Sequence, residues 1–244
     1  MAIPVLRNRS SLIILLAFCG QLPAQNPQLN TRTGSRFPTV VFTSVLWSAE
    51  PAYYSIAVDA TGTATYQSAP ESVGRTGVLY SINFYVSDRT RRTIFNVARE
   101  LDFFRGEIEV QPVSSAADKA LTLMYYDLGF TTQLAYSSSP NSDIEELTSI
   151  FEEVSETLEY GRRLAYLQQH ERKKIAAELK ALQANADRHV LRALQIIAPV
   201  LRGLSADSGL DADSRRMAQS LADGAMRHVQ GALGTAGAGG GSKP

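Results

Sequence analysis

A change of hydrophobic period near Pro140 constrains the fold of this chain more than any other feature. Before it, apolar and polar residues alternate, most clearly at Val78, Tyr80, Ile82, Phe84 and Val86. After it, apolar residues recur every three or four positions, as in Ile144, Leu147, Phe151, Val154 and Leu158. Period two indicates half-buried strands, and the longer period indicates amphipathic helices. The sequence therefore predicts an α+β fold in which an antiparallel sheet precedes a C-terminal all-α segment.

The sheet portion is predicted from strand-like runs separated by turns. The turn Asp59-Ala60-Thr61-Gly62 is typical of a bulged hairpin. One helix interrupts the strands: Asp88 caps it, and an apolar stripe from Ile94 to Phe104 packs it against one sheet face. The strand-like runs are residues 39–47, 54–58, 63–66, 78–86, 121–127 and 130–137.

The C-terminal part is predicted to be helical throughout. Ser142 and Glu145 suit a capping box, and the apolar stripe that follows breaks at Gly161. A second stripe runs from Val190 to Leu204, where Pro199 is expected to kink or interrupt the helix. The predicted divisions are a signal peptide (1–24), a linker (25–37), an α+β domain (38–160), a helical domain or extension (161–233) and a flexible Gly-rich tail (234–244).

The N-terminus has the order of a secretory signal peptide. Arg7 and Arg9 precede an apolar run from Leu12 to Phe18, and a small-residue cleavage site ends at Ala24. A periplasmic or secreted protein is therefore expected, without a transmembrane segment after cleavage. Cleavage would remove Cys19, the only cysteine. The alternative is a lipoprotein anchored through Cys19, although Phe18 stands where a bacterial lipobox needs a small residue.

Charge argues against a nucleic-acid partner. The 244 residues carry 24 Lys and Arg against 24 Asp and Glu, so the formal net charge is zero. Basic pairs occur along the helical patterns, but acids such as Glu100, Glu159, Glu171 and Asp213 lie within a few residues of them. This pattern predicts solvated helix faces with local ion pairs.

Motifs for metal and nucleophilic chemistry are incomplete. His170-Glu171 begins like a zinc-protease motif, but Lys174 stands where the second histidine ligand is required. His189 and His228 fall in other predicted helices, which favours surface histidines. Ser115 is followed at the third position by an acid, not by the lysine of a serine nucleophile motif. We therefore assign no catalytic, cofactor-binding or metal-binding residue.

Two features leave a functional alternative open. Glu107 and Glu109 would share a face if their segment is extended, with Asp102 nearby, and a carboxylate pair of this kind could hydrolyse a glycan. Aromatic residues could also offer a binding face for a glycan or peptide, although cross-strand packing is the favoured reading. These aromatic residues are Tyr53, Tyr54, Tyr66, Tyr80, Tyr85, Phe103, Phe104, Tyr125, Tyr126 and Tyr136.

The run from Tyr54 through Gly62 to Tyr66, with a later helix closing on Asp102-Phe103-Phe104, resembles a family of uncharacterised bacterial exported domains. The resemblance covers about residues 39–160 and is closest to exported hypothetical proteins of soil acidobacteria. It implies a secreted α+β domain and supplies no catalytic residues. Many members carry cysteines where Ala52 and Tyr53 stand here, so a role of those cysteines does not transfer.

Two hypotheses of function follow. The first is a non-enzymatic interaction or scaffold module of the cell envelope, whose helices from Ser142 onward dock a protein partner. These helices would either pack on the sheet or form a homodimer. On this reading, deletion of residues 162–244 should leave a folded α+β domain that no longer captures its partner. The alternative is an envelope glycan hydrolase that uses Glu107 and Glu109.

Overall fold

The computed structural model describes residues 36–47, 49–69, 79–114 and 116–234, with only the backbone of 228–234. All of these residues belong to one compact unit, Thr33–Pro244. The predicted signal peptide, Cys19, the linker up to residue 35, Ser115 and the tail from residue 235 lie outside the described residues.

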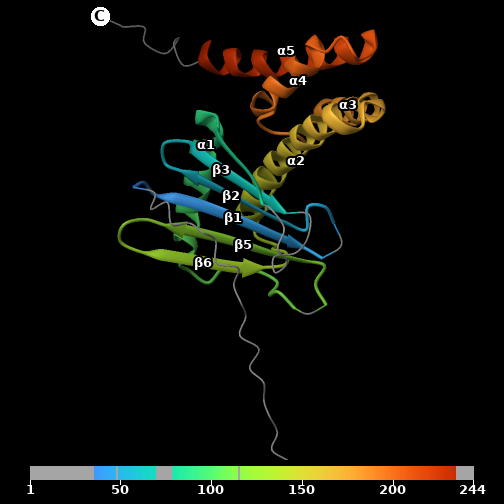
Figure 1. Ribbon diagram of the computed structural model, residues 1–244. Coiled ribbons are helices and arrows are strands. Elements are labelled where there is room, and N and C mark those ends of the chain that lie inside the picture. The colour runs from blue at the N-terminus through green and yellow to red at the C-terminus, as the bar shows by residue number, and fades with distance from the viewer. Residues whose placement is uncertain (1–35, 48, 70–78, 115, 235–244) are drawn as a thin grey trace, which may run out of the picture. The chain divides into compact units, whose positions relative to one another are not determined.

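Six strands form one antiparallel sheet in the order β4-β3-β2-β1-β5-β6 (Figure 1). A bulged turn joins β2 to β3, where Gly62 has a φ of +90° and the Asp59 carboxylate accepts the backbone N–H groups of Thr61 and Thr63. The strands are β1 (Thr39–Leu46), β2 (Tyr53–Asp59), β3 (Thr63–Ala69), β4 (Tyr80–Tyr85), β5 (Lys119–Tyr126) and β6 (Thr131–Tyr136). The predicted α+β class is confirmed, including the C-terminal helical segment.

Five α-helices and three short 3₁₀ turns complete the described chain. The α-helices are α1 (Asp88–Glu100), α2 (Ser142–His170), α3 (Ile175–Asp187), α4 (Ala198–Ala206) and α5 (Ala212–Gly234). The 3₁₀ turns are η1 (Asp102–Phe104), η2 (Arg172–Lys174) and η3 (Leu194–Ile196). No helix in the described part of the chain is both long and apolar enough to cross a bilayer.

One hydrophobic core lies between the sheet and the helices α1 and α2. Alternate residues of every strand enter it, because successive strand side chains point to opposite faces. Phe42 of β1, for example, stacks on Phe151 of α2 with ring centroids 5.2 Å apart. The first half of α2 therefore joins α1 as a second helix on the same sheet face.

A second hydrophobic core holds the helical segment together. It contains the C-terminal half of α2 together with α3, α4 and α5, and its buried residues are mostly leucine, isoleucine and alanine. The two cores meet within α2, which is continuous for 29 residues. Whether residues 38–160 and 161–233 fold as independent domains stays a prediction.

The structure shows how the helices continue at the two irregular positions of the stripes. The break in the apolar stripe at Gly161 does not end the helix, because α2 runs through it, and a Cβ there would lie 2.5 Å from Ile197 Cγ2. The glycine therefore lets the segment before α4 approach α2 closely. No helix starts at Val190; α4 begins at Ala198, with Pro199 in the first turn, where the missing N–H costs no hydrogen bond.

Both helix N-caps lie one residue before the predicted position. Ser87, not Asp88, caps α1, since its hydroxyl accepts the Thr90 N–H at 3.1 Å. Asn141, not a Ser142 capping box, caps α2, and its carbonyl oxygen accepts two backbone N–H groups of the first turn.

The Asp-Phe-Phe sequence after α1 forms a left-handed turn. Asp102, Phe103 and Phe104 have φ values of 47°, 52° and 63°. Each such residue costs about 1–2 kcal/mol in an L-amino-acid chain. Ring packing offsets this cost, since Phe104 is buried and the Phe103 ring lies 4.6 Å from that of Tyr125.

Candidate functional site

The candidate site lies where α2 leaves the sheet. Along its length α2 meets successive strands, since Thr148 Oγ1 lies 2.7 Å from Tyr136 Oη of β6 and Phe151 stacks on Phe42 of β1. One turn further on, Ser155 and Glu159 lie against β3. The helix therefore crosses the sheet from the β6 edge toward the β4 edge.

Glu159 is the centre of a buried polar cluster at this crossing. Its side chain is 2% exposed, and one carboxylate oxygen accepts the hydroxyls of Tyr66 and Ser68, both at 2.7 Å. The other oxygen accepts the Arg162 Nε–H at 2.6 Å. Both carboxylate oxygens thus accept hydrogen bonds, and one of the donors is charged, as the burial of a charge requires.

Burial and this carboxylate also set the titration of nearby tyrosines. Burial, followed by the Glu159 charge, holds the pKa of Tyr66 far above its usual value. The same two causes raise the pKa of Tyr80 on β4, and the Arg162 charge opposes them. The Tyr80 ring lies 6.3 Å from the ring of Tyr66, so β4 carries an aromatic side chain next to this cluster.

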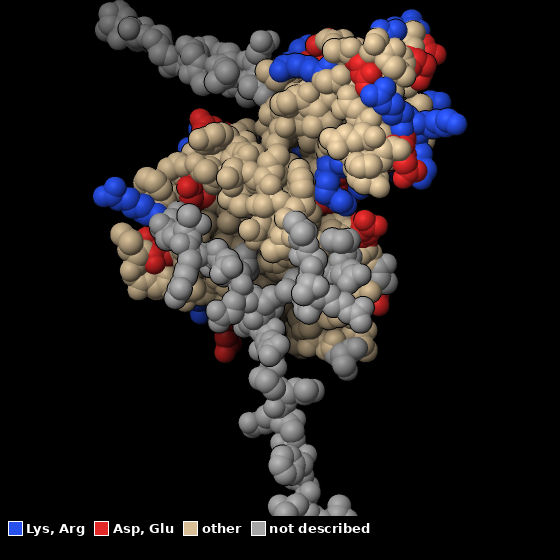
Figure 2. Space-filling view, in the orientation of Figure 1, with Lys and Arg blue, Asp and Glu red and all other residues tan. Residues whose placement is uncertain are grey.

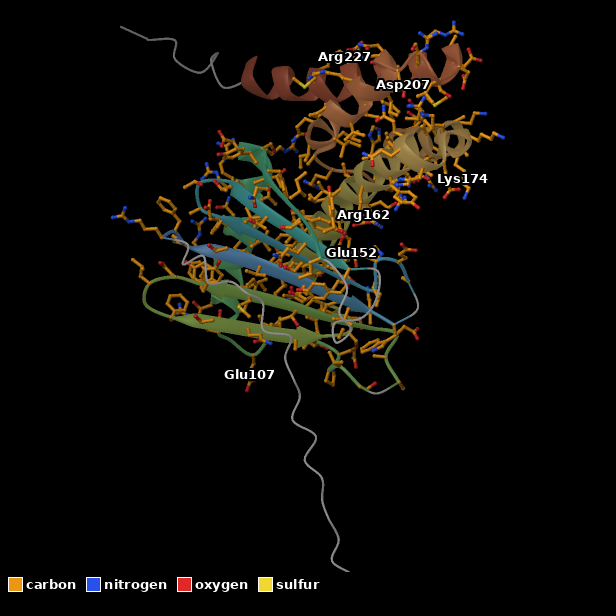
Figure 3. All side chains as sticks on the ribbon, viewed as in Figure 1. Glu107, Glu152, Arg162, Lys174, Asp207 and Arg227 are labelled. Atoms are coloured by element: carbon orange, nitrogen blue, oxygen red, sulfur yellow. The ribbon has the colours of Figure 1, made fainter. Side chains whose placement is uncertain are left out.

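On the two sides of the cluster, polar contacts join α2 to the sheet and to the connection before α4. Arg162 also reaches Glu50 in the β1–β2 loop, at 3.7 Å, and Figure 3 shows Arg162 between the sheet and the helical segment. Arg192, in the connection before α4, pairs with Glu153 at 2.8 Å, and its carbonyl accepts the Thr157 hydroxyl. The junction is therefore held by defined contacts as well as by apolar packing.

β4 is the last strand on this side of the described sheet, and α2 continues for about two turns after Arg162. Residues seven positions apart share one side of a helix, so the sheet-facing side that carries Leu158 and Glu159 continues with Ala165 and Tyr166. Tyr166 is 52% exposed, and its ring stacks on His170 at 4.3 Å. We call this part of the sheet-facing side of α2 the overhang; it comprises Arg162, Ala165, Tyr166 and Gln169, none of which is buried.

The edge of β4 next to the overhang has unpaired backbone groups. Val86 donates its N–H to Gly62 across the β3–β4 pair, and antiparallel bonding alternates along a strand. The N–H and C=O groups of Ser81, Asn83 and Tyr85 therefore point away from β3. Within the described residues these outward groups have no backbone partner, and all three residues are exposed.

The sequence-predicted carboxylate pair lies elsewhere. Glu107 and Glu109 are exposed in a segment without regular structure, and Figure 3 shows Glu107 pointing away from the body of the protein. Neither carboxylate is hydrogen-bonded or ion-paired within the described residues. The backbone carbonyl of Glu109 accepts the Ser139 hydroxyl at 2.7 Å, so this segment lies beside the end of β6.

The histidines are spread over the helical segment. His170 stacks on Tyr166, while Lys174 pairs with Glu171 and His189 is exposed in a left-handed turn. The side chain of His228 lies outside the described residues. Among the described side chains, no three His, Cys, Asp or Glu residues are grouped closely enough to hold a metal ion.

Most of the candidate aromatic residues belong to the sheet core. Tyr80, Phe103 and Tyr126 are half-buried, and Tyr85 at the end of β4 is 73% exposed. The others are buried: Tyr53, Tyr54, Tyr66, Phe104, Tyr125 and Tyr136. Structural packing therefore accounts for most of this set, and Tyr85 is its most exposed member.

The prediction of solvated helix faces fails at Glu159. Its neighbour Arg162 points toward the sheet as well, whereas Arg163 pairs with Glu178 of α3 at 2.6 Å. The sequence offered one signal for this burial, because Glu159 directly follows Leu158 and lies one turn after Ser155 on the apolar stripe. In Figure 2, blue and red side chains gather over the helices, in agreement with the other basic groups.

No family model matches this chain, and no curated protein matches it significantly.

Proposed function

We propose that this chain is an exported, non-enzymatic interaction module of the cell envelope, which docks a protein partner on its helical segment. The observation that carries the proposal is the shared helix α2. Its first half completes the sheet core, and its second half supports a separate core with α3, α4 and α5. The sheet face is already covered by α1 and α2, so the outer surface of the helical segment is available for contacts.

The surface chemistry of the helical segment supports a protein partner. Lys173 and Arg202 are exposed and have no ion pair among the described residues, and acids such as Asp187 and Asp223 are exposed on the same helical segment. A surface that mixes both signs suits the polar rim of a protein interface better than a polyanion.

Cross-linking of the tagged full chain in its native envelope tests the proposal. We expect a reproducible protein partner whose cross-links map to residues 161–227. The double variant K173E/R202E should lose at least tenfold of this capture, and the matched variant R92E on α1 should keep it. Copurified glycan fragments, with cleavage activity lost in E107Q, would instead support the alternative hydrolase.

A further inference from the structure

We infer that β4 accepts one additional β-strand from a partner protein, and that this strand lies beneath the overhang of α2. The inference rests on the proposed function and extends it, because the partner that docks on the helical segment would also pair one strand with the neighbouring sheet edge. Three observations carry it: the outward backbone groups of β4, which have no backbone partner among the described residues, the length of α2 after Glu159, and the absence of charge on β4 itself.

The β4 edge offers a row of backbone donors and acceptors. Ser81, Asn83 and Tyr85 direct their N–H and C=O groups outward, at positions where a partner strand would bond. Proteins commonly protect such edges with lysine, proline or a covering segment. The β4 sequence Tyr-Ser-Ile-Asn-Phe-Tyr contains none of these residues.

The opposite edge of the sheet is partly protected. At the end of β6, Gln111 forms a bridge with Ser138, and the Ser137 N–H donates to the Gln111 carbonyl at 2.9 Å. The Ser139 hydroxyl adds a bond to the same segment at Glu109. A chain segment therefore already occupies part of the β6 edge, which makes β6 the natural internal control.

The overhang supplies a helix layer for the missing strand. Neighbouring strands lie about 4.8 Å apart, which corresponds to about three residues of α-helix. Since Glu159 contacts β3, this spacing brings β4 to the level of Arg162 and the next strand position to the level of Ala165 and Tyr166. The half-exposed ring of Tyr166 would then cover an apolar side chain of the added strand.

Charge complementarity selects the kind of strand. No side chain of β4 is charged, and Arg162 is already paired with Glu159 and Glu50. An extended, uncharged segment with small or apolar residues at alternate positions and no proline fits this site. Such a segment pairs through its backbone and places its apolar side chains under α2.

A labelled peptide with the β3 sequence Thr-Ala-Thr-Tyr-Gln-Ser-Ala is a suitable probe, since it is uncharged and already pairs with β4 from the other side. We expect saturable binding to the full chain by fluorescence anisotropy. The S81P variant removes an outward N–H and should weaken binding at least tenfold. Q133P makes the matching change on β6 and should leave binding unchanged, whereas Y166A should weaken it several-fold.

Each outcome bears on the inference. If S81P fails to fold by circular dichroism, N83K decides instead, because it adds a charge to the same edge. No peptide binding, or equal losses in S81P and Q133P, would overturn the strand site. A dimer in sedimentation that S81P dissociates would also overturn it, since the occupant would be a second copy. Envelope capture that persists in S81P would overturn the strand site alone and leave the proposed function standing.

Discussion

The two hydrophobic cores of this protein are built from different chemistry. The sheet core contains many rings, among them Phe42, Tyr66, Phe84 and Phe151, and it includes the buried carboxylate of Glu159. The core of the helical segment is almost entirely aliphatic, with Tyr160 as its one aromatic member. Rings and buried polar bonds demand defined geometry, whereas aliphatic side chains tolerate repacking. The sheet region is therefore suited to a fixed body, and the helical segment to a surface that can vary.

Substitution of a ring in the sheet core should have the largest effect. We expect F151A to lower the free energy of unfolding by about 3–5 kcal/mol, because removal of the ring that stacks on Phe42 leaves a cavity in the core. Trp47, the only tryptophan, lies in the sheet region and reports on it by fluorescence, while circular dichroism follows the helices. Both signals should shift together in urea, since Phe151 belongs to α2.

The contrasting variant is L201A in α4, where Leu201 is fully buried in the helical core. Its helical signal should be lost at lower urea than the Trp47 signal. Coincident transitions in L201A would show that the two cores unfold as one unit and would break the comparison.

The polar junction should have an intermediate effect. E159Q keeps the shape of the side chain but removes the charge that accepts the Tyr66, Ser68 and Arg162 donors. Hydrogen bonds to charged groups contribute about 1.5–3 kcal/mol, so urea unfolding should show a loss in that range. The matched variant E156Q, at an exposed position of the same helix, should change stability by less than about 0.5 kcal/mol. An equal loss of stability in both variants would show that the buried carboxylate of Glu159 does not stabilise the junction.

The sequence anticipated elements whose signals are local. Alternation predicted the strands, and the Asp59–Gly62 turn was recognised because its residues determine its backbone. The position of Glu159 could not be predicted, since its burial depends on Tyr66 and Ser68, which lie more than 90 residues away in the chain. The same holds for Gly161, where the apolar stripe breaks, because its role depends on Ile197, which lies 36 residues later in the chain. The overhang, too, follows from where the sheet ends, and periodicity does not report that.

The smallest expected effect is a difference in pH response between the two regions. A backbone bond from Gly209 and a side-chain bond from Gln168 lower the pKa of Asp207, and bonds from Ser214 lower the pKa of Asp211. A carboxylate whose pKa is lower in the folded protein than its unfolded value of about 3.9 stabilises the fold at pH values above that unfolded value. This stabilisation is lost as the pH falls through the folded pKa. The helical segment should therefore lose stability first below about pH 4.

The sheet should lose stability at high pH instead. Burial raises the pKa of Tyr54, Tyr66 and Tyr136, so their contribution is complete below about pH 10 and is lost as the pH rises further. Thermal unfolding between pH 3 and pH 11, followed by circular dichroism and by Trp47 fluorescence, measures both limits. In D207N the unfolding temperature of the helical signal should depend less on pH below about pH 4. The pH dependence of the sheet signal above about pH 10 should be unchanged.

The central position of β1 has a consequence for how the chain folds in time. On one side β1 pairs with β2, which follows within a few residues, but on the other side Thr39 pairs with Tyr126. Phe151, whose ring stacks on Phe42 of β1, is synthesised later still. Closing such long loops is entropically costly, and folds rich in distant contacts form in milliseconds to seconds. The middle of the sheet and its helix cover therefore cannot be completed before β5 and α2 have been synthesised. Such a delay suits a polypeptide that is proposed to cross a membrane before it folds.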